Sequence, residues 1–138
     1  MTNEPRQDLD DRIDAIETGY EYFLAYAAQG RNTDRDAGAA HSQVREHLTN
    51  MERALEGLDG VVRNNLSSRG PELVDACGAL LGALAADAAI AQAAIRLVAA
   101  QTAISSQLID NLNASIHMRA LLTDLFIFDE ALKPPKPE

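Results

Sequence analysis

The chain has 138 residues, a formal net charge of −9 and a hydrophobic content of 46%, with aromatic residues at only 4%. This length suits one domain with a core of its own, and the apolar content is too high for a disordered chain. The negative charge argues against nucleic acid and anionic membranes as partners, because both need basic surface. A single cysteine excludes an internal disulfide, and we expect a reducing, cytoplasmic location.

The N-terminal third predicts a short tail followed by a helix. Residues 1–7 are mostly polar and predict a flexible tail, after which Asp8 or Asp10 can cap a helix. Apolar residues then recur in steps of four and three, the spacing of one helical face: Leu9, Ile13, Ile16, Tyr20, Phe23 and Ala27. Gly30 lies where a helix of this phase ends.

A polar loop over residues 31–38 precedes a second predicted helix. Its apolar positions again step by four and three: Val44, Leu48, Met51, Leu55, Leu58 and Val62. Gly57 and Gly60 weaken its end, and residues 64–70 form the clearest turn in the chain. Pro71 then stands at a first helical position, where proline is accepted.

The stretch from Ala76 to Ile109 is the most distinctive part of the chain. Thirteen of its 34 residues are alanine, and its only charged side chains are Asp87 and Arg96. A helix without a charged face lies at the centre of a bundle or on one side of an intermolecular contact. The stretch is long enough to cross a bilayer, but Asp87 near its middle would cost about 2.5–3.5 kcal/mol there, so we predict no membrane span.

The region 71–133 is compatible with one helix or two. A turn near residues 101–106, with Ser105 or Ser106 capping the following helix, is the interpretation we favour. A break near residues 111–115 and an uninterrupted helix are the alternatives. The predicted fold is all-α: a single domain over 8–133, an antiparallel four-helix bundle with long helices, followed by a disordered proline-rich tail at 134–138.

Small residues on the alanine-rich helix are the first candidate contact site. Gly78 and Gly82, followed by Ala86 and Ala89, allow another backbone to approach closely. The neighbour is either another helix of the same chain or a second subunit. Either contact predicts that Gly82→Leu destabilises the protein by about 1–3 kcal/mol through overpacking.

Aromatic residues form the second candidate contact site. Tyr22 and Tyr26 are one turn apart and lie off the predicted apolar stripe, so they either widen the core face or mark a partner surface. Phe126 and Phe128 belong to an apolar cluster at 125–128 that is too wide for one stripe. We expect another subunit or a partner to cover part of this cluster.

Metal and histidine chemistry has little support in the sequence. A di-iron bundle needs Glu-x-x-His on two helices, and none of the three histidines has a glutamate at that spacing: His41, His47 and His117. We therefore predict no metal and no cofactor, and we place His47 at the solvent edge. Phosphotransfer on His41 is a weak candidate, because the Lys-Gly pair usual after such a histidine is missing.

Three further arrangements resemble catalytic sites only loosely. Arg35 and His41 have a spacing found in small helical nucleases, but Arg35 lies in a predicted loop. Glu17 and Glu21, one turn apart beside Tyr20, could act as acid and base or bind a cation, yet acidic helix surfaces produce such pairs often. Cys77 occupies an apolar-stripe position and predicts a buried, inert thiol.

The sequence thus favours a non-enzymatic helical interaction or assembly protein that forms a homodimer and binds a protein partner. The alternative is a bundle that binds a small apolar ligand or cofactor between its helices, because an alanine-rich core leaves unfilled volume. A phosphotransfer or nuclease domain is the third candidate. Neither nucleic acid nor a membrane is expected as a partner.

Overall fold

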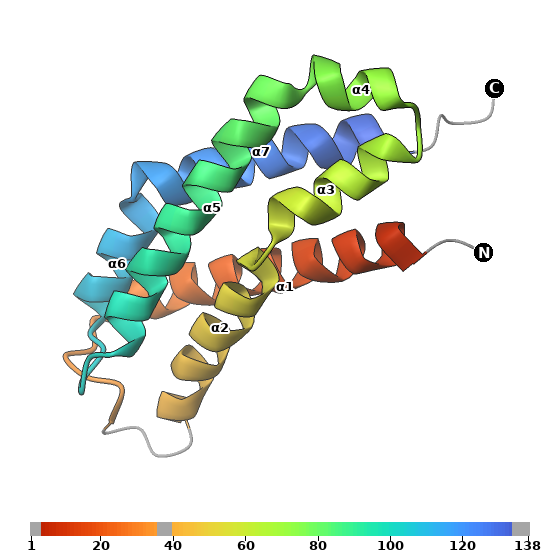
Figure 1. Ribbon diagram of the computed structural model, residues 1–138. Coiled ribbons are helices and arrows are strands. Elements are labelled where there is room, and N and C mark those ends of the chain that lie inside the picture. Colours follow the sequence, from red (N-terminus) through yellow and green to blue (C-terminus); the bar gives the residue numbers. More distant parts are fainter. Residues whose placement is uncertain (1–3, 36–39, 134–138) are drawn as a thin grey trace.

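The structure, a computed structural model, describes residues 4–35 and 40–133 (Figure 1). Within these residues the only regular secondary structure is helical and no strand is present, which confirms the all-α prediction. Seven helices follow one another within it: α1 (Glu4–Ala27), α2 (Ala40–Leu55), α3 (Leu58–Ser67), α4 (Pro71–Ala76), α5 (Gly78–Ala99), α6 (Ser106–Ala114) and α7 (Ile116–Leu132).

Helix α1 is a single helix with the predicted apolar face. Leu9, Ile16 and Phe23 on this face are fully buried. The helix begins at Glu4, so residues 4–7 are helical and not part of a flexible tail as expected. Arg6 explains the earlier start, because it pairs with Asp10 at 3.1 Å and with Asp129 of α7 at 2.9 Å. Residues 1–3 and 134–138, the other parts of the predicted tails, lie outside the described residues.

The second predicted helix is divided into α2 and α3. Gly57 adopts φ 66°, a left-handed conformation that glycine accepts more readily than other residues, and the chain turns there. Arg12 of α1 donates to the carbonyl oxygen of Ala54 at 3.2 Å and to that of Glu56, so carbonyls left free at the end of α2 have partners. Gly57 therefore ends the helix and does more than weaken it.

The region 71–133 is divided at three places, so an uninterrupted helix is wrong. The favoured break is present at residues 100–105, where the Ser105 hydroxyl oxygen accepts from the Leu108 amide at 3.0 Å as the predicted cap. The alternative break is present as well, at Ser115, between α6 and α7. A further break at Cys77, between α4 and α5, was not predicted.

The helices pack around a largely aliphatic core. Helix α1 packs against α2, α3 and α6, while α5 packs against α7, α2 and α3 (Figure 1). The N-terminal end of α1 and the C-terminal end of α7 lie at the same end of the molecule, where the Arg6–Asp129 ion pair joins them (Figure 1).

A buried carboxylate joins the two long loops at the other end. Asp34 is 0% exposed; it accepts from the Ile104 amide at 2.9 Å and from Arg45 Nε at 2.8 Å. Burial alone raises the pKa of such a carboxyl, but these hydrogen bonds outweigh it and hold the pKa of Asp34 below its ordinary value. Arg45 also donates to the carbonyls of Ala99 and Gln101 at 3.1 and 2.8 Å, which fixes the C-terminal end of α5.

Backbone and hydroxyl groups extend this junction on the side of α1. The Tyr26 hydroxyl donates to the Ile104 carbonyl at 2.7 Å, and the Ser106 hydroxyl donates to the Tyr26 carbonyl at 2.6 Å. The Ser106 amide donates to the Arg31 carbonyl at 2.9 Å. We call Tyr26, Arg31, Asp34, Arg45, Ile104 and Ser106 the polar junction. It sets where α5 ends and where α6 begins.

Candidate functional site: the outer face of α5

Helix α5 buries one face in the core. Six residues spaced by three or four positions are buried there: Leu81, Leu84, Ala88, Ala91, Ile95 and Val98. This face packs against α7, α2 and α3. The helix is therefore firmly placed, and its opposite side has a fixed orientation.

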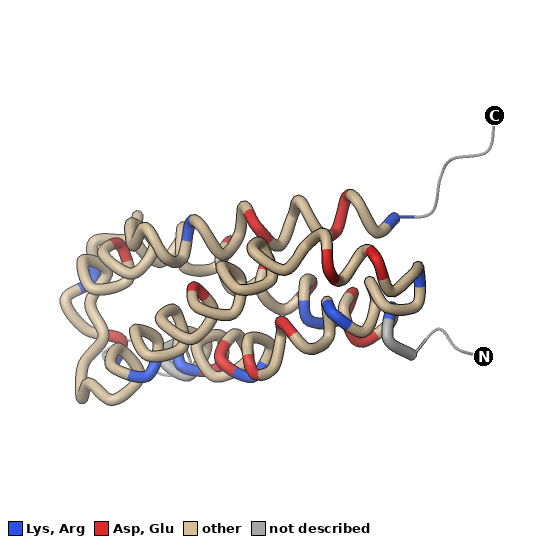
Figure 2. Tube along the Cα trace, turned by 45° about the horizontal axis from the view of Figure 1, so that its top comes forward, with Lys and Arg blue, Asp and Glu red and all other residues tan. Residues whose placement is uncertain are grey.

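The opposite side of α5 is apolar and open to solvent. Eight residues that share this side are exposed, and none carries a polar side chain: Ala79, Gly82, Ala83, Ala86, Ala89, Ile90, Ala93 and Leu97. We call them the outer α5 face. Ile90 and Leu97 are its large members, at 43% and 65% exposure. Figure 2 shows α5 almost without charged residues. A contiguous apolar strip on a rigid helix is typical of an interaction site.

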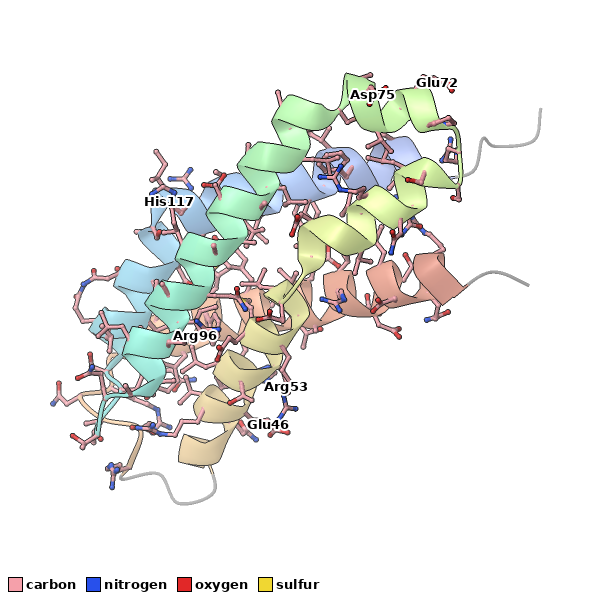
Figure 3. All side chains as sticks on the ribbon, in the orientation of Figure 1. Glu46, Arg53, Glu72, Asp75, Arg96 and His117 are labelled. Carbon is pink, nitrogen blue, oxygen red and sulfur yellow. The ribbon has the colours of Figure 1, made fainter. Side chains whose placement is uncertain are left out.

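Polar side chains of α5 lie at the two edges of this face. Gln92 donates to Glu56 Oε1 at 3.0 Å, and Arg96 pairs with Glu52 of α2. On the other edge Asp87 Oδ1 lies 3.0 Å from His117 Nδ1 of α7. Figure 3 shows Arg96 and His117 on these two sides of α5. The charges of α5 are thus paired along the edges, and its centre is uncharged, as in an interface with a polar rim.

Gly78 and Gly82 make no close helix contact inside the chain. A Cβ placed on either glycine meets no atom within 4 Å, and both residues are exposed. The prediction of an internal core contact at these glycines is therefore wrong, because their side of α5 faces solvent. Ala86 and Ala89 lie on the same exposed side. The contact with a second subunit stays a prediction.

The predicted aromatic contact residues divide into buried and exposed ones. Tyr26 and Phe128 are each 2% exposed and belong to the core, so they offer no surface to a partner. Tyr22 is half-buried, and its ring stacks on that of His47 with centroids 4.3 Å apart. Phe126 alone of the four is largely accessible, at 41% exposure. The tyrosines therefore widen the core face of α1.

An open groove of about 510 Å³ runs between α1 and α2. Seven of its nine lining residues are polar or charged: Asp11, Arg12, Asp14, Thr18, His47, Asn50 and Arg53. Arg12 is already bound to the end of α2. The groove combines both signs of charge, and no single ligand chemistry follows from it.

The remaining chemical candidates are Arg35, His41 and Cys77. Arg35 donates to the Thr102 carbonyl beside the polar junction, whereas the side chain of His41 lies outside the described residues. Cys77 is half-buried between α4 and α5. Within 4–35 and 40–133 no three His, Cys, Asp or Glu side chains are grouped so that they could hold a metal ion. Nothing in the described part of the chain brings a nucleophile and a base together.

Helix α5 also has the length and mean hydropathy to cross a membrane, with 22 residues, although only 28% of its most apolar window is buried in the chain. Core helices of proteins outside membranes also have this length and hydropathy, but they are mostly buried. The expected absence of a membrane partner and the cytoplasmic location stay predictions. Comparison with known proteins found no match among protein-family models, curated proteins or solved structures.

Proposed function

We propose that this protein is a non-enzymatic assembly protein that forms a homodimer through the outer α5 face. The observation that carries the proposal is the exposure of eight apolar positions on one side of a well-packed helix, including Leu97 at 65%. Burying these side chains against a second copy removes apolar surface from water without burying a charge. The alternative to a second copy is a different protein that presents a similar apolar helix to the same face.

The distribution of side-chain size along the face favours an antiparallel dimer. The N-terminal half carries Gly82 and alanines, and the C-terminal half carries Ile90 and Leu97. Antiparallel pairing sets Leu97 of one copy against the small residues around Ala79 of the other. Parallel pairing sets Leu97 against Leu97 and leaves the glycine ends under-packed. Antiparallel helices also oppose their macrodipoles.

The expected affinity of this dimer is moderate. Helix α5 has 22 residues and is therefore about 33 Å long at 1.5 Å per residue. A strip of this length and one helix wide is at the small end of stable interfaces, which bury roughly 800 Å² per partner. We expect a dissociation constant in the micromolar range.

We also infer that the seven helices act as four interrupted segments of an antiparallel bundle. The segments are α1, α2 with α3, α4 with α5, and α6 with α7. The packing of α1 on α2 and α6, and of α5 on α7 and α2, supports this arrangement. The outer α5 face then belongs to one corner of the bundle.

A bound apolar ligand between the helices has less support. The α1–α2 groove is an open surface groove edged by charged side chains of both signs, whereas apolar ligands are held in pockets that enclose most of their surface. The phosphotransfer and nuclease candidates depend on His41, whose side chain lies outside the described residues, so they stay predictions.

Cysteine cross-linking tests both the dimer and its orientation. In a Cys77→Ser background, Ala89→Cys lies close to the centre of the face and Gly82→Cys lies about six residues from it. In an antiparallel dimer the two copies of residue 89 are close enough for a disulfide, whereas those of residue 82 are roughly 18 Å apart along the axis.

We therefore expect oxidation to give a covalent dimer with Ala89→Cys and none with Gly82→Cys. Cross-linking of both variants contradicts the antiparallel orientation. Cross-linking of neither, with a monomer in solution, contradicts the proposed dimer. Ala114→Cys, an exposed alanine at the end of α6, is the control for random collision.

A further inference from the structure

A second pocket lies between α1 and α7, away from the outer α5 face. It has a volume of about 250 Å³ and is lined by Glu17, Tyr20, Glu21, Leu122 and Phe126. Pockets for drug-sized ligands measure roughly 300–1,000 Å³, so this one suits a single head group.

The pocket carries two exposed carboxylates on one side. Neither Glu17 nor Glu21 has a hydrogen bond or ion pair with any residue that the structure describes, and no Lys or Arg lines the pocket. Burial raises the pKa of Glu17, the nearby Asp14, Asp129 and Glu21 raise it further, and Lys133 offsets part of this rise. A cation placed here gains a favourable interaction with two carboxylates that form no hydrogen bond or ion pair within 4–35 and 40–133.

The other walls of the pocket are aromatic and aliphatic. Tyr20 comes from α1, while Leu122 and the 41%-exposed Phe126 come from α7. An organic cation close to the face of such rings is attracted by their quadrupole. A bare metal ion needs several converging oxygen or nitrogen ligands, and no group of three acidic, His or Cys side chains within 4–35 and 40–133 offers them.

We propose that this pocket binds a methylated ammonium group. Glu17 and Glu21 neutralise its positive charge, and Tyr20, Phe126 and Leu122 contact its methyl groups. The group has two possible sources, a free small molecule such as choline or a trimethylated lysine on a protein.

Titration with choline, followed by backbone amide chemical shifts of the intact chain, tests this proposal. Choline should cause saturable shifts at the pocket residues with a dissociation constant of ~1 mM, since the carboxylates stay partly solvated. The matched probe is 3,3-dimethyl-1-butanol, in which carbon replaces the charged nitrogen. We expect it to bind at least tenfold more weakly. Equal binding of the two probes, or no saturation with choline at ~20 mM, would overturn the proposal.

Variants at the pocket separate charge from aromatic contact. The double variant Glu17→Gln, Glu21→Gln should weaken choline binding at least tenfold, and Phe126→Leu should weaken it several-fold. Glu46→Gln and Glu72→Gln are controls, because these exposed glutamates lie on α2 and α4 (Figure 3). Unchanged binding in either pocket variant contradicts the proposal, provided that the variant keeps the amide spectrum of a folded chain.

The source of the ammonium group is decided by a second ligand. Three ligands are titrated separately: choline, a short peptide with one trimethyllysine, and the same peptide with alanine in place of the trimethyllysine. Binding of the trimethyllysine peptide at least tenfold tighter than choline assigns the pocket to a protein partner. Similar affinity for the two assigns it to small molecules. Equal binding of the alanine peptide contradicts recognition of the methylated group.

Discussion

The polar junction and the outer α5 face are two parts of the surroundings of α5 that differ in how their side chains are satisfied. At the end of α5, Asp34 and Arg45 supply charge and hydrogen bonds to one another and to the loop at 100–105. Along the outer side of α5, eight exposed residues carry no polar side chain and so form no comparable ion pair or side-chain hydrogen bond. The junction has its partners within one chain, whereas the outer face leaves apolar side chains exposed to solvent.

This difference separates stability from association. Changes at the junction should lower the free energy of unfolding whatever the protein concentration. Changes at the outer α5 face should alter the dimer and leave the isolated chain almost as stable as before. The predictions below use this separation and run from the largest expected effect to the smallest.

Asp34→Ala should destabilise the protein by about 2–4 kcal/mol. The change removes the only buried carboxylate of the junction, leaves Arg45 without its ion-pair partner and leaves the Ile104 amide unsatisfied. Urea unfolding measures the effect. Asp110→Ala, at an exposed position on α6, is the matched control and should change stability by less than about 0.5 kcal/mol. A loss below 1 kcal/mol for Asp34→Ala contradicts the role of the junction.

Leu97→Glu should weaken the dimer by about 2 kcal/mol, a factor of roughly 30 in the dissociation constant, because it places two carboxylates in an apolar interface. Stability of the isolated chain should change little, since Leu97 is 65% exposed. Sedimentation equilibrium measures the constant. Ile116→Glu, at a 74%-exposed residue outside the outer α5 face, is the control. If both variants weaken association equally, the face has been placed wrongly.

Tyr26→Phe should lower stability by about 1–2 kcal/mol. The variant keeps the ring but removes the donor to the buried Ile104 carbonyl. Tyr22→Phe on the same helix is the control, because no residue that the structure describes forms a hydrogen bond with the Tyr22 hydroxyl. Thermal or urea unfolding should therefore distinguish the two tyrosines, and equal effects would count against the junction.

Gly82→Leu should have the smallest effect on the isolated chain, and in the stabilising direction. A Cβ at Gly82 meets no atom within 4 Å, so leucine gains helix propensity of about 0.5–1 kcal/mol without overpacking. This reverses the sign expected if the glycine lay in an internal contact. Unfolding measured far below the dimer dissociation constant tests it. A lowered urea midpoint under those conditions would show a contact inside the chain.

Periodicity predicted the helices better than it predicted their ends. The apolar steps from Leu9 and from Val44 correctly identified the buried faces of α1 and α2. Ser105 was visible as a cap because serine favours that position. Ser115 has no glycine or proline nearby to mark its break, whereas Gly78 directly follows Cys77 and is a local signal for the break there.

The candidate sites depended still more on contacts between distant residues. Tyr26 lies off the predicted stripe, and its burial goes with a hydrogen bond to Ile104, 78 positions away in the sequence. In the sequence Asp34 is one polar residue among others in a loop. Its role follows only from the fold, which places Arg45 and the Ile104 amide within hydrogen-bond distance of it. The absence of charge on α5 was plain in the sequence, but which of its sides faces solvent followed only from its packing on α7, α2 and α3.

The mass of the protein in solution tests the central claim most directly. Light scattering or sedimentation over ~1 to ~100 µM brackets the micromolar constant that we expect. We predict that the mass of the wild type rises from one chain to two across this range, while Leu97→Glu stays largely monomeric. A wild type that remains a monomer at ~100 µM, or a Leu97→Glu variant that associates as strongly as the wild type, would contradict the account.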